Sequence, residues 1–558
     1  MGVTSTTTAR PRTWRQLPPW WGRTAQRLWV ALFAVAAVGS CLLILRSGAD
    51  DQLADLHVYW GAVRAVNAGR PLYEFQAANG DPFTYPPFAE LVLAPLMQLP
   101  FPVAGAIWTA LTLLAIVAVG WVMAHRGLEV AAARRPATTW LVALGVLVSA
   151  PGQSNLHFGQ VSLLLVLLCL VDGLGVVPER WRGVLTGVAA AIKLTPLLFV
   201  VHLAITGQRR AAARALGSFV AASLVAAVVL PRDSLDFWTS AIFSTDRIGD
   251  LSAWGNQSLN GLLLRTGLPV SVEHLLWLSV VAILVGAGLA RARRLHRLGD
   301  APAATVVVGC ATILASPVSW THHQFWTVLA AMVMIGTTGR LRRVAGWVLL
   351  AIMTINLGQV LDVSGSPTPG TQYLADNLRG LAACALCVTG LLAATSGVSP
   401  VTTGSYLVST TRWRRPPRVR VIGTLLVVVA LFVVLPLPSR GTTRVTPATT
   451  GQASALVSSW GYCSDGECRT GGILFPVNYT VGWDVDLVSI SGLANPAVTR
   501  IDYVPSPGRP PVHLVLDPLP TGEHAWAFTS GDTAYGQLLV YSAHDHLIGE
   551  YGRKLREG

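Results

Sequence analysis

Long apolar runs alternate with short arginine-rich segments over most of this chain. Runs long enough to cross a hydrocarbon core, about 18 residues or more, recur from residue 28 to residue 437. One soluble core cannot hold so many runs, so the pattern predicts an all-α polytopic membrane protein. The predicted apolar segments lie near residues 28–46, 86–99, 102–124, 137–150, 158–177, 183–206, 213–231, 272–290, 303–316, 323–338, 344–361, 378–395 and 421–437.

Composition agrees with this prediction. The chain has 558 residues, of which 52% are hydrophobic and only 12% charged, whereas a soluble domain is about 25% charged. The net charge of +13 could suggest a nucleic-acid partner. However, 39 of the 41 basic residues are arginine, and many of these lie in short clusters between apolar runs. The charge therefore indicates the positive-inside bias of a membrane protein, and we expect no nucleic-acid partner.

The arginine clusters predict which segments face the cytoplasm. Five clusters contain 20 arginines and no acidic residue, at 10–27, 209–214, 291–297, 340–343 and 412–420. Three other segments contain 11 acidic residues against 5 basic ones, at 47–85, 231–271 and 362–377. We therefore expect these three segments on the extracytoplasmic side.

The number of membrane crossings has two solutions. Thirteen crossings from a cytoplasmic N-terminus place all five arginine clusters inside, but they leave "RRP" at 134–136 outside. Eleven crossings also fit the later clusters, provided that 86–124 crosses once and one other segment does not span. The run 183–206 is a candidate for that segment because "KLTP" interrupts it, and proline breaks the hydrogen-bond ladder of a helix.

Four regions follow from these patterns. Residues 1–27 predict a disordered cytoplasmic N-terminus, and residues 28–437 the transmembrane domain. The Pro/Thr/Gly-rich residues 438–455 predict a linker. Residues 456–558 contain alternating runs such as "VHLVLDPL" and "GQLLVYSA", which are typical of strands. We expect a small extracytoplasmic β-rich domain there.

The seven cysteines divide into two groups. Cys463 and Cys468 lie in the polar tail, where a disulfide between them would need an oxidising compartment. The other five lie in apolar runs and are interpreted as small packing residues. "CALC" has the spacing of a redox or zinc motif, but no second cysteine pair accompanies it.

The stretch "DLHVYWGAVRAVNAG" crowds polar groups beside the first apolar run. Val58, Ala62, Ala65 and Val66 share one face of a helix, which predicts a helix along the membrane surface. Asp55, at its start, could be a helix-capping or solvated residue. It could also be a general base that takes the proton from an acceptor hydroxyl.

Other polar residues near apolar segments have two interpretations each. Lys193 lies inside an apolar run, where it either snorkels to the surface or balances a phosphate. Tyr85 precedes two prolines and belongs to an aromatic belt or lines a site. His322 and His323 are adjacent and cannot both face one metal from a regular helix, but one of them could serve as a phosphate donor or proton carrier. Uncharged groups suited to sugar hydroxyls are found at Asn256, Gln257, Ser258 and Asn260.

Six stretches taken in order resemble the membrane glycosyltransferases of the GT-C superfamily, in particular glycosyltransferase family 87, the actinobacterial enzymes that use polyprenyl-phosphate sugars. The resemblance covers roughly residues 28–395. The stretches are "ADLHVYWGAVRAVNAGRPLY", "FTYPPFAELVLAPL", "HFGQVSLLLVLL", "AAIKLTPLLFV", "GNQSLNGLLLR" and "SPVSWTHHQF". It implies a GT-C-like fold of about 11 to 13 transmembrane helices and an extracytoplasmic active site whose catalytic aspartate falls on Asp55.

The resemblance also implies a reaction. Asp55 would deprotonate the hydroxyl of a lipid-linked or cell-envelope glycan acceptor, which displaces polyprenyl phosphate from mannose in one inverting step. The departing phosphate would be stabilised by His322, His323, Lys193 or Arg265. Tyr59, Tyr85 and Gln160 lie in the matching stretches and are further candidates for contacting substrate. The lipid leaves as a monophosphate, so no metal is obligatory and no cofactor is expected.

Two other functions stay open on sequence alone. An arabinofuranosyltransferase of the same family would share the fold and mechanism but use polyprenyl-phosphate arabinose. A transporter or flippase would carry charged or broken segments near the bilayer midplane, whereas most polar candidates here lie at segment ends. The resemblance assigns no role to residues 440–558, for which we hypothesise a domain that holds glycan or a cell-wall partner.

Overall fold

The computed structural model describes the helical part of the chain almost continuously. The described residues are 19–46, 52–77, 81–243, 251, 253–266, 270–337, 339–357, 369–391 and parts of 441–552. The α-helices are α1 (Pro19–Arg46), α2 (Ala54–Asn67), α3 (Pro87–Met97), α4 (Phe101–Val122), α5 (Arg135–Val148), α6 (Ala150–Phe158), α7 (Ser162–Gly173), α8 (Val184–Ile192), α9 (Leu197–Ile205), α10 (Arg209–Val229), α11 (Pro231–Thr239), α12 (Leu259–Leu264), α13 (Val270–Arg297), α14 (Ala301–Ala315), α15 (Phe325–Ile335), α16 (Arg340–Thr354) and α18 (Pro369–Thr389).

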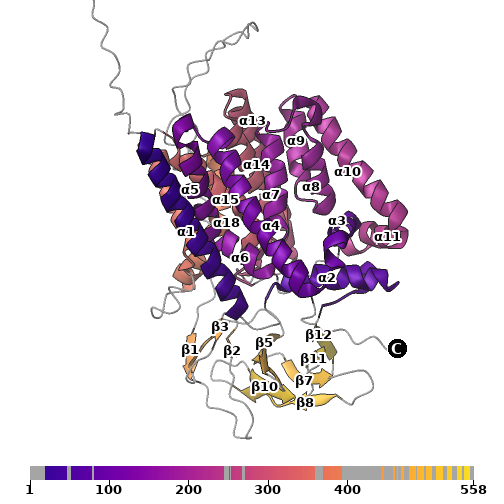
Figure 1. Cartoon of the computed structure of the whole chain (residues 1–558). Coiled ribbons are helices and arrows are strands. Elements are labelled where there is room, and N and C mark those ends of the chain that lie inside the picture. The colour runs from indigo at the N-terminus through magenta and orange to yellow at the C-terminus, as the bar shows by residue number, and fades with distance from the viewer. Residues whose placement is uncertain are drawn as a thin grey trace, which may run out of the picture. The chain divides into compact units, whose positions relative to one another are not determined.

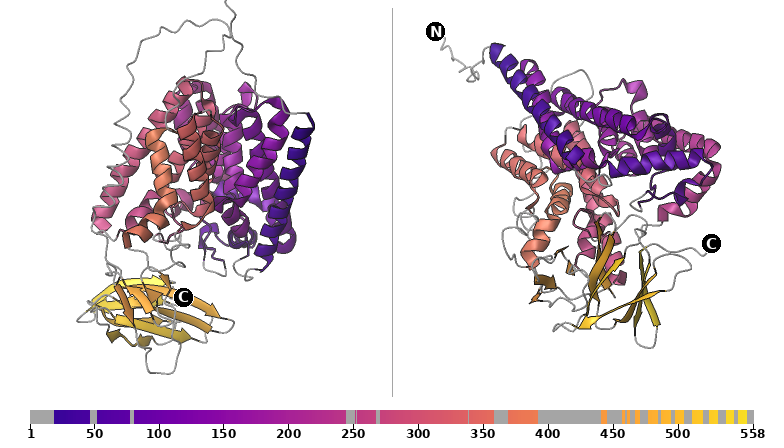
Figure 2. Two further views of the ribbon diagram at one scale, coloured as in Figure 1. Left: turned by 90° about the vertical axis from the view of Figure 1, so that its left-hand side faces the viewer. Right: turned by 60° about the horizontal axis from the view of Figure 1, so that its bottom comes forward.

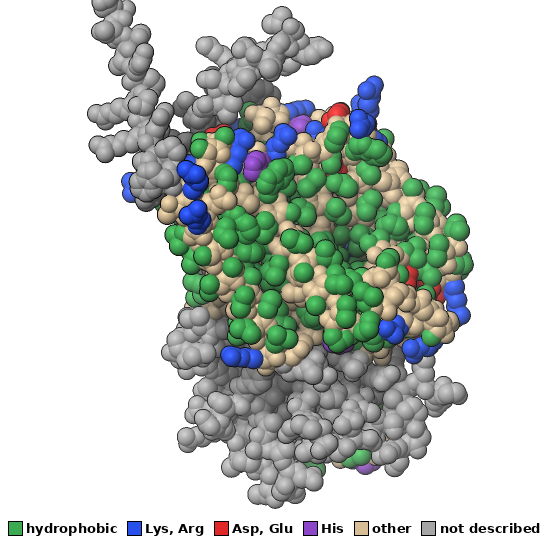
Figure 3. Space-filling model, viewed as in Figure 1, with side chains coloured by type: hydrophobic (Ala, Val, Ile, Leu, Met, Phe, Trp, Pro, Cys, Tyr) green, Lys and Arg blue, Asp and Glu red, His purple; other side chains and the backbone are tan. Residues whose placement is uncertain are grey.

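Several helices have the length and surface of membrane spans. Among the described residues, four helices are long and apolar enough to cross a membrane, with apolar stretches at Arg23–Arg46, Phe101–Gly127, Arg209–Val229 and Val272–Arg297. Valines on the outside of these helices are largely exposed, for example Val228 at 82%. Figure 3 shows hydrophobic side chains over the middle of the helical face, with Lys and Arg above and below it. Such a surface is stable against lipid and costly in water.

The innermost helices have no polar face. Every residue of α14 from Ala303 to Leu314 is buried, as expected for a helix that is apolar all round. Gly309 lies under the indole ring of Trp326, where a Cβ would collide with the ring. This glycine therefore allows α14 and α15 to pack closely.

Several predicted segments form helices shorter than a membrane span, and two segments bear on the number of crossings. The run near 86–99 folds as α3, which has 11 residues. At about 1.5 Å per residue it covers roughly half of a hydrocarbon core. The run near 183–206 divides into α8 and α9 at Lys193–Pro196, as the "KLTP" sequence predicts. The short α3 agrees with the solution in which 86–124 crosses once.

The helix predicted in "DLHVYWGAVRAVNAG" is confirmed as α2 (Ala54–Asn67), and its position along a membrane surface stays a prediction. It runs across the ends of longer helices such as α4 rather than parallel to them (Figures 1 and 2). Val58, Ala62 and Ala65 are buried on its inner face, as the sequence pattern predicts. α2 packs on α3 and α6, and Gly159 at the end of α6 lies next to Leu56 in the first turn of α2.

The C-terminal unit is β-rich, as predicted, and all of its strand pairs are antiparallel. Two four-stranded sheets have the orders β5-β6-β10-β9 and β12-β11-β7-β8, and two small sheets pair β1 with β4 and β2 with β3. Trp526 and Tyr503 are buried in its core. The strands are β1 (Gly441–Arg444), β2 (Val457–Ser458), β3 (Gly461–Tyr462), β4 (Glu467–Thr470), β5 (Val477–Asp484), β6 (Leu487–Ala494), β7 (Val498–Val504), β8 (Val512–Leu514), β9 (Asp517–Pro518), β10 (His524–Ser530), β11 (Gln537–Ser542) and β12 (His546–Gly552).

Some predictions fall outside the described part of the chain. These are residues 1–18 of the predicted N-terminus, the apolar segment 421–437 and the Cys463–Cys468 disulfide. The prediction of disorder over residues 1–27 is wrong for residues 19–27, which form the start of α1. Strand β1 lies within the segment 438–455 that the sequence predicts as a linker.

Candidate functional site

Asp55 lies in the first turn of α2, where the N-terminal end of the helix favours a carboxylate. Leu53 precedes the helix in a left-handed conformation (φ 53°), and its N–H donates to the carbonyl of His157 at 2.9 Å. This bond ties the start of α2 to α6. The ring of His57 stacks on Phe101 at 3.6 Å between centroids, so His57 has a packing role in this arrangement.

A tight turn after α6 brings Gln160 against α2. Gly159 ends α6 with φ 69°, a conformation that favours glycine. A Cβ at Gly159 would also lie 2.8 Å from the Cβ of Leu56. Asn155 holds the next residue, because its Nδ2 donates to the carbonyl of Gln160 at 3.0 Å. The position of Gln160 is thus determined by backbone geometry and by α2 itself.

Gln160 connects two tyrosines to Asp55. The hydroxyls of Tyr59 and Tyr85 lie 3.1 and 3.0 Å from Gln160 Oε1, and they lie 3.1 Å from each other. Because Oε1 accepts from these hydroxyls, the amide nitrogen of Gln160 is left to donate toward the Asp55 side chain, an interaction that lowers the pKa of Asp55. Tyr59 is one turn after Asp55 on α2, so the helix places both beside Gln160.

The environment of Asp55 changes its acidity. Burial raises the pKa of Asp55 from 3.8 to about 7, an effect opposed by the hydrogen bond from Gln160. The charge of Asp81 raises the pKa further, and that of Lys193 lowers it. A carboxyl with a pKa near 7 can both accept and release a proton at neutral pH, as a general base requires.

Lys193 lies at the break between α8 and α9, and its ammonium group points to the same region. Nζ is 2.7 Å from Nε2 of His323 and 5.1 Å from the centre of the Tyr85 ring. The imidazole of His323 is held in place because its Nδ1 accepts the N–H of Trp320 at 3.0 Å. A continuous chain of contacts therefore runs from Asp55 through Gln160 and Tyr85 to Lys193 and His323.

His322 faces a different partner from His323. Its Nδ1 lies 3.3 Å from Oγ of Ser154, and its Nε2 is buried without a hydrogen-bond partner among the described residues. Burial lowers the pKa of both imidazoles, and the charge of Lys193 lowers them further. Both effects favour the neutral form of the rings, and His322 has an unused nitrogen.

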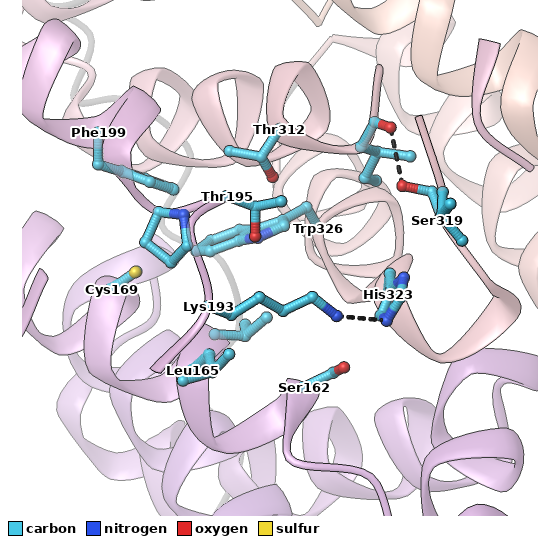
Figure 4. Close-up of a pocket in the computed structure, with 14 residues that line it drawn as sticks. Ser162, Leu165, Cys169, Lys193, Thr195, Phe199, Thr312, Ser319, His323 and Trp326 are labelled. Atoms are coloured by element: carbon cyan, nitrogen blue, oxygen red, sulfur yellow. Dashed lines mark hydrogen bonds between the residues drawn. The ribbon is translucent and has the colours of Figure 1, made fainter. Parts of the chain in front are cut away.

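A cavity begins at Lys193 and His323 and continues between apolar side chains. Figure 4 shows Lys193 pointing toward His323, with Ser162 beside them and Phe199 and Cys169 farther along the wall. The sequence did not single out Ser162, Thr195 or Trp326 as lining residues. Ser162 lies two residues after Gln160 in "HFGQVS", a signal that could have identified it.

The polar loop before α12 has mainly internal partners. Asn256 Oδ1 accepts the N–H of Ser319 at 2.9 Å, and Ser258 Oγ donates to the carbonyl of Pro317 at 2.8 Å. Gln257 accepts the N–H of Gly380 at 2.9 Å. These bonds fix the segment that leads to the two histidines. Asn260 is buried in the same segment, and its sugar-binding role stays a prediction.

Arg265 is also buried and paired. Its guanidinium donates to Asn377 Oδ1 at 3.0 Å and to the carbonyls of Ala253 and Asn256 at 2.8 and 2.9 Å. This geometry joins α12 to α18, and the predicted contact of Arg265 with phosphate stays a prediction. Among the described residues, no three His, Cys, Asp or Glu side chains are grouped to hold a metal.

Comparison with known proteins identifies relatives of the chain. The family model "Glycosyltransferase family 87" matches residues 83–317. A polyprenol-phosphate-mannose-dependent alpha-(1-2)-phosphatidylinositol mannoside mannosyltransferase of Mycobacterium tuberculosis is 33% identical over 351 residues, which are 59% of this chain and 81% of the relative. A polyprenol-phosphate-mannose-dependent alpha-(1-2)-phosphatidylinositol pentamannoside mannosyltransferase of Mycolicibacterium smegmatis is 34% identical over 328 residues, 55% of this chain and 76% of the relative. No solved structure gives a significant match.

Proposed function

The chain belongs to glycosyltransferase family 87, and on this premise we propose that it transfers mannose from polyprenyl phosphate to a glycolipid. The relatives described above are named for a polyprenol-phosphate-mannose donor and phosphatidylinositol mannoside acceptors. The observation that carries the proposal is the chain of contacts from Asp55 to Lys193 and His323. It places a carboxyl with a pKa near 7 close to a cationic group and an apolar cavity.

The cavity at Lys193 has the chemistry of a polyprenyl-phosphate site. Lys193 and His323 offer a cation and a nitrogen donor to phosphate oxygens, and such charge-assisted bonds are strong. Beyond them the wall contains Leu165, Phe199 and Trp326, against which an isoprenoid chain can pack. The phosphate would thus lie at Lys193, and the attached mannose would extend toward Tyr85 and Asp55.

The transfer is a single inverting displacement. The acceptor oxygen forms a bond to the anomeric carbon as the bond from that carbon to the phosphate oxygen breaks. Asp55 takes the hydroxyl proton, and the electron pair leaves on polyprenyl phosphate. Lys193 and His323 stabilise the charge that develops on the leaving phosphate. A β-linked mannosyl donor then gives an α-linked product.

The tyrosine–glutamine cluster positions the base. Gln160 holds the Asp55 carboxyl through its amide nitrogen, while the hydroxyls of Tyr59 and Tyr85 hold Gln160 through Oε1. A base that is fixed before substrate arrives needs no reorganisation in the transition state. His322 has an unused buried nitrogen, which suits a hydroxyl of the sugar.

The distribution of arginine clusters indicates the side of the membrane on which the reaction takes place. The three acidic segments include the start of α2, so we place Asp55 on the extracytoplasmic face. Cysteines introduced at Glu74 and Arg180, both exposed, test this orientation. A membrane-impermeant maleimide applied to whole cells should label E74C but not R180C, relative to the parent protein. Labelling of R180C but not of E74C would show that the protein has the opposite orientation in the membrane.

Sugar transfer in membranes tests the function. Membranes with the intact protein, Asp55→Asn or the control Asp236→Asn, at matched expression, are supplied with radiolabelled polyprenyl-phosphate mannose and total lipid acceptors. Transfer by the intact protein and Asp236→Asn, but not by Asp55→Asn, is expected. Equal transfer by all three proteins would show that Asp55 is not the base. Incorporation from polyprenyl-phosphate arabinose but not from the mannose donor would assign an arabinofuranosyltransferase, and no transfer from either would favour transport.

A further inference from the structure

A second polar cavity lies at the C-terminal end of α7, away from Ser162 at its other end. It is formed where α7, α9 and α13 end and where α8, α10 and α14 begin. Its polar lining residues are Asp172, Arg182, Thr186, His202, Gln208, His296 and Thr305. None of them belongs to the chain of contacts around Asp55.

Two buried polar atoms of this cavity lack partners among the described residues. His202 is only 6% exposed, and its Nδ1 makes no hydrogen bond. The Nε of Arg182, another lining residue, is also buried without a partner. The ring of His296 lies 6.0 Å from that of His202. Buried polar groups are nearly always satisfied, so two orphans in one cavity point to an absent ligand or to water.

Among the described lining residues, the carboxylate of Asp172 already has its hydrogen-bond partners. Asp172 accepts from the N–H groups of Gly183 and Thr186 at 2.6 and 3.0 Å, and from the Thr186 hydroxyl at 2.8 Å. Glu179 lies 3.7 Å from Arg182, but its side chain is 76% exposed and it does not line the cavity. The unused groups inside are therefore nitrogens that can donate, and one of them belongs to a permanent cation.

The surroundings also favour an anion. α10 begins with Arg209 and Arg210, and α13 ends with Arg294 and Arg297, all of which are exposed. Clustered arginines raise the local concentration of anions. We propose that the cavity formed by Arg182, His202 and His296 binds a phosphate group.

The phosphate could be free or could belong to a lipid. Phe199 lines this cavity and also the cavity at Lys193, and α7, α9 and α14 contribute to both. A lipid with its phosphate at Arg182 would thus find an apolar wall leading inward from it. Inorganic phosphate and a lipid phosphate offer the same oxygens to the three side chains, so binding measurements must separate them.

Phosphate binding to the purified full chain tests the proposal. The background variant Lys193→Gln removes the cation of the other cavity. Thermal unfolding is followed while inorganic phosphate is titrated against chloride at equal ionic strength. In parallel, short-chain phosphatidic acid is titrated against phosphatidylcholine in detergent. Arg182→Gln is compared with Arg180→Gln, an exposed arginine two residues earlier that does not line the cavity.

We expect one of the two phosphates to stabilise the Lys193→Gln background, and the one that does identifies the source. Arg182→Gln should weaken this binding by about tenfold or more, because it removes a charge-assisted bond. Arg180→Gln should leave it unchanged. His296→Gln, at a half-buried position, should weaken binding even if Arg182→Gln fails to fold. No stabilisation by either phosphate, or equal affinities in Arg182→Gln, His296→Gln and Arg180→Gln, would show that only water fills the cavity.

Discussion

Replacing Asp55 by asparagine should abolish transfer and at the same time stabilise the folded protein at alkaline pH. Burial raises the pKa of this carboxyl from 3.8 to about 7, so the folded state binds its proton more tightly than the unfolded state. The cost of the charged form is absent below the unfolded pKa and is fully present above the folded pKa. A pKa difference between 3.8 and about 7 corresponds to about 4 kcal/mol. Because Asp55 is partly exposed, water screens part of this cost, and we expect about 1 to 2 kcal/mol.

Thermal unfolding of the intact protein and Asp55→Asn in detergent measures this effect between pH 5 and pH 8. The melting temperature of Asp55→Asn minus that of the intact protein should increase with pH, reaching about 1 to 4 °C at pH 8. Asp236→Asn, at a position of α11 that is likewise partly exposed, controls for loss of charge. A melting temperature of Asp55→Asn that falls below that of the intact protein as pH rises would refute the reasoning. It would show that the carboxylate is held by net favourable interactions, as in a structural role.

Three further predictions follow from the same site. Lys193→Gln should lower kcat/KM for the polyprenyl-phosphate donor, measured from initial rates, by about 10- to 100-fold, because a charged hydrogen bond to phosphate is lost. Lys193→Arg should retain part of the activity, and an unchanged kcat/KM in Lys193→Gln would argue against a contact between Lys193 and phosphate. In the intact protein kcat/KM should rise with pH near pH 7, and Gln160→Glu, which puts a second carboxylate beside Asp55, should move this rise to higher pH by about one unit or more. An unmoved pH profile would show that Gln160 does not influence the pKa of the base. Gly159→Ala should lower both the melting temperature and kcat/KM more than Gly175→Ala does, since both glycines have positive φ but only at Gly159 would a Cβ collide with α2. Equal losses in the two variants would show that the backbone conformation alone, and not the contact with α2, requires glycine.

The structure brings some of the predicted site residues together and leaves others apart, for a physical reason. Asp55, Tyr59 and Tyr85 lie near the ends of apolar runs, where a polar side chain stands out. Arg265 also stands out in that way, yet its guanidinium is paired with Asn377, which lies 112 residues later. A buried cation can contact substrate or be paired within the protein, and the hydrophobic pattern around it in the sequence does not distinguish the two.

What the sequence determines by itself is local. Hydropathy predicts the helices of the membrane part, the "KLTP" interruption predicts the break between α8 and α9, and alternation predicts the C-terminal strands, because each depends on neighbouring residues. The tertiary structure alone decides that Tyr59 meets Gln160 across 101 residues and that Lys193 meets His323 across 130. It also joins Arg182, His202 and His296 around one cavity. These contacts depend on how the helices pack against one another, because only packing brings residues so distant in sequence within hydrogen-bond distance.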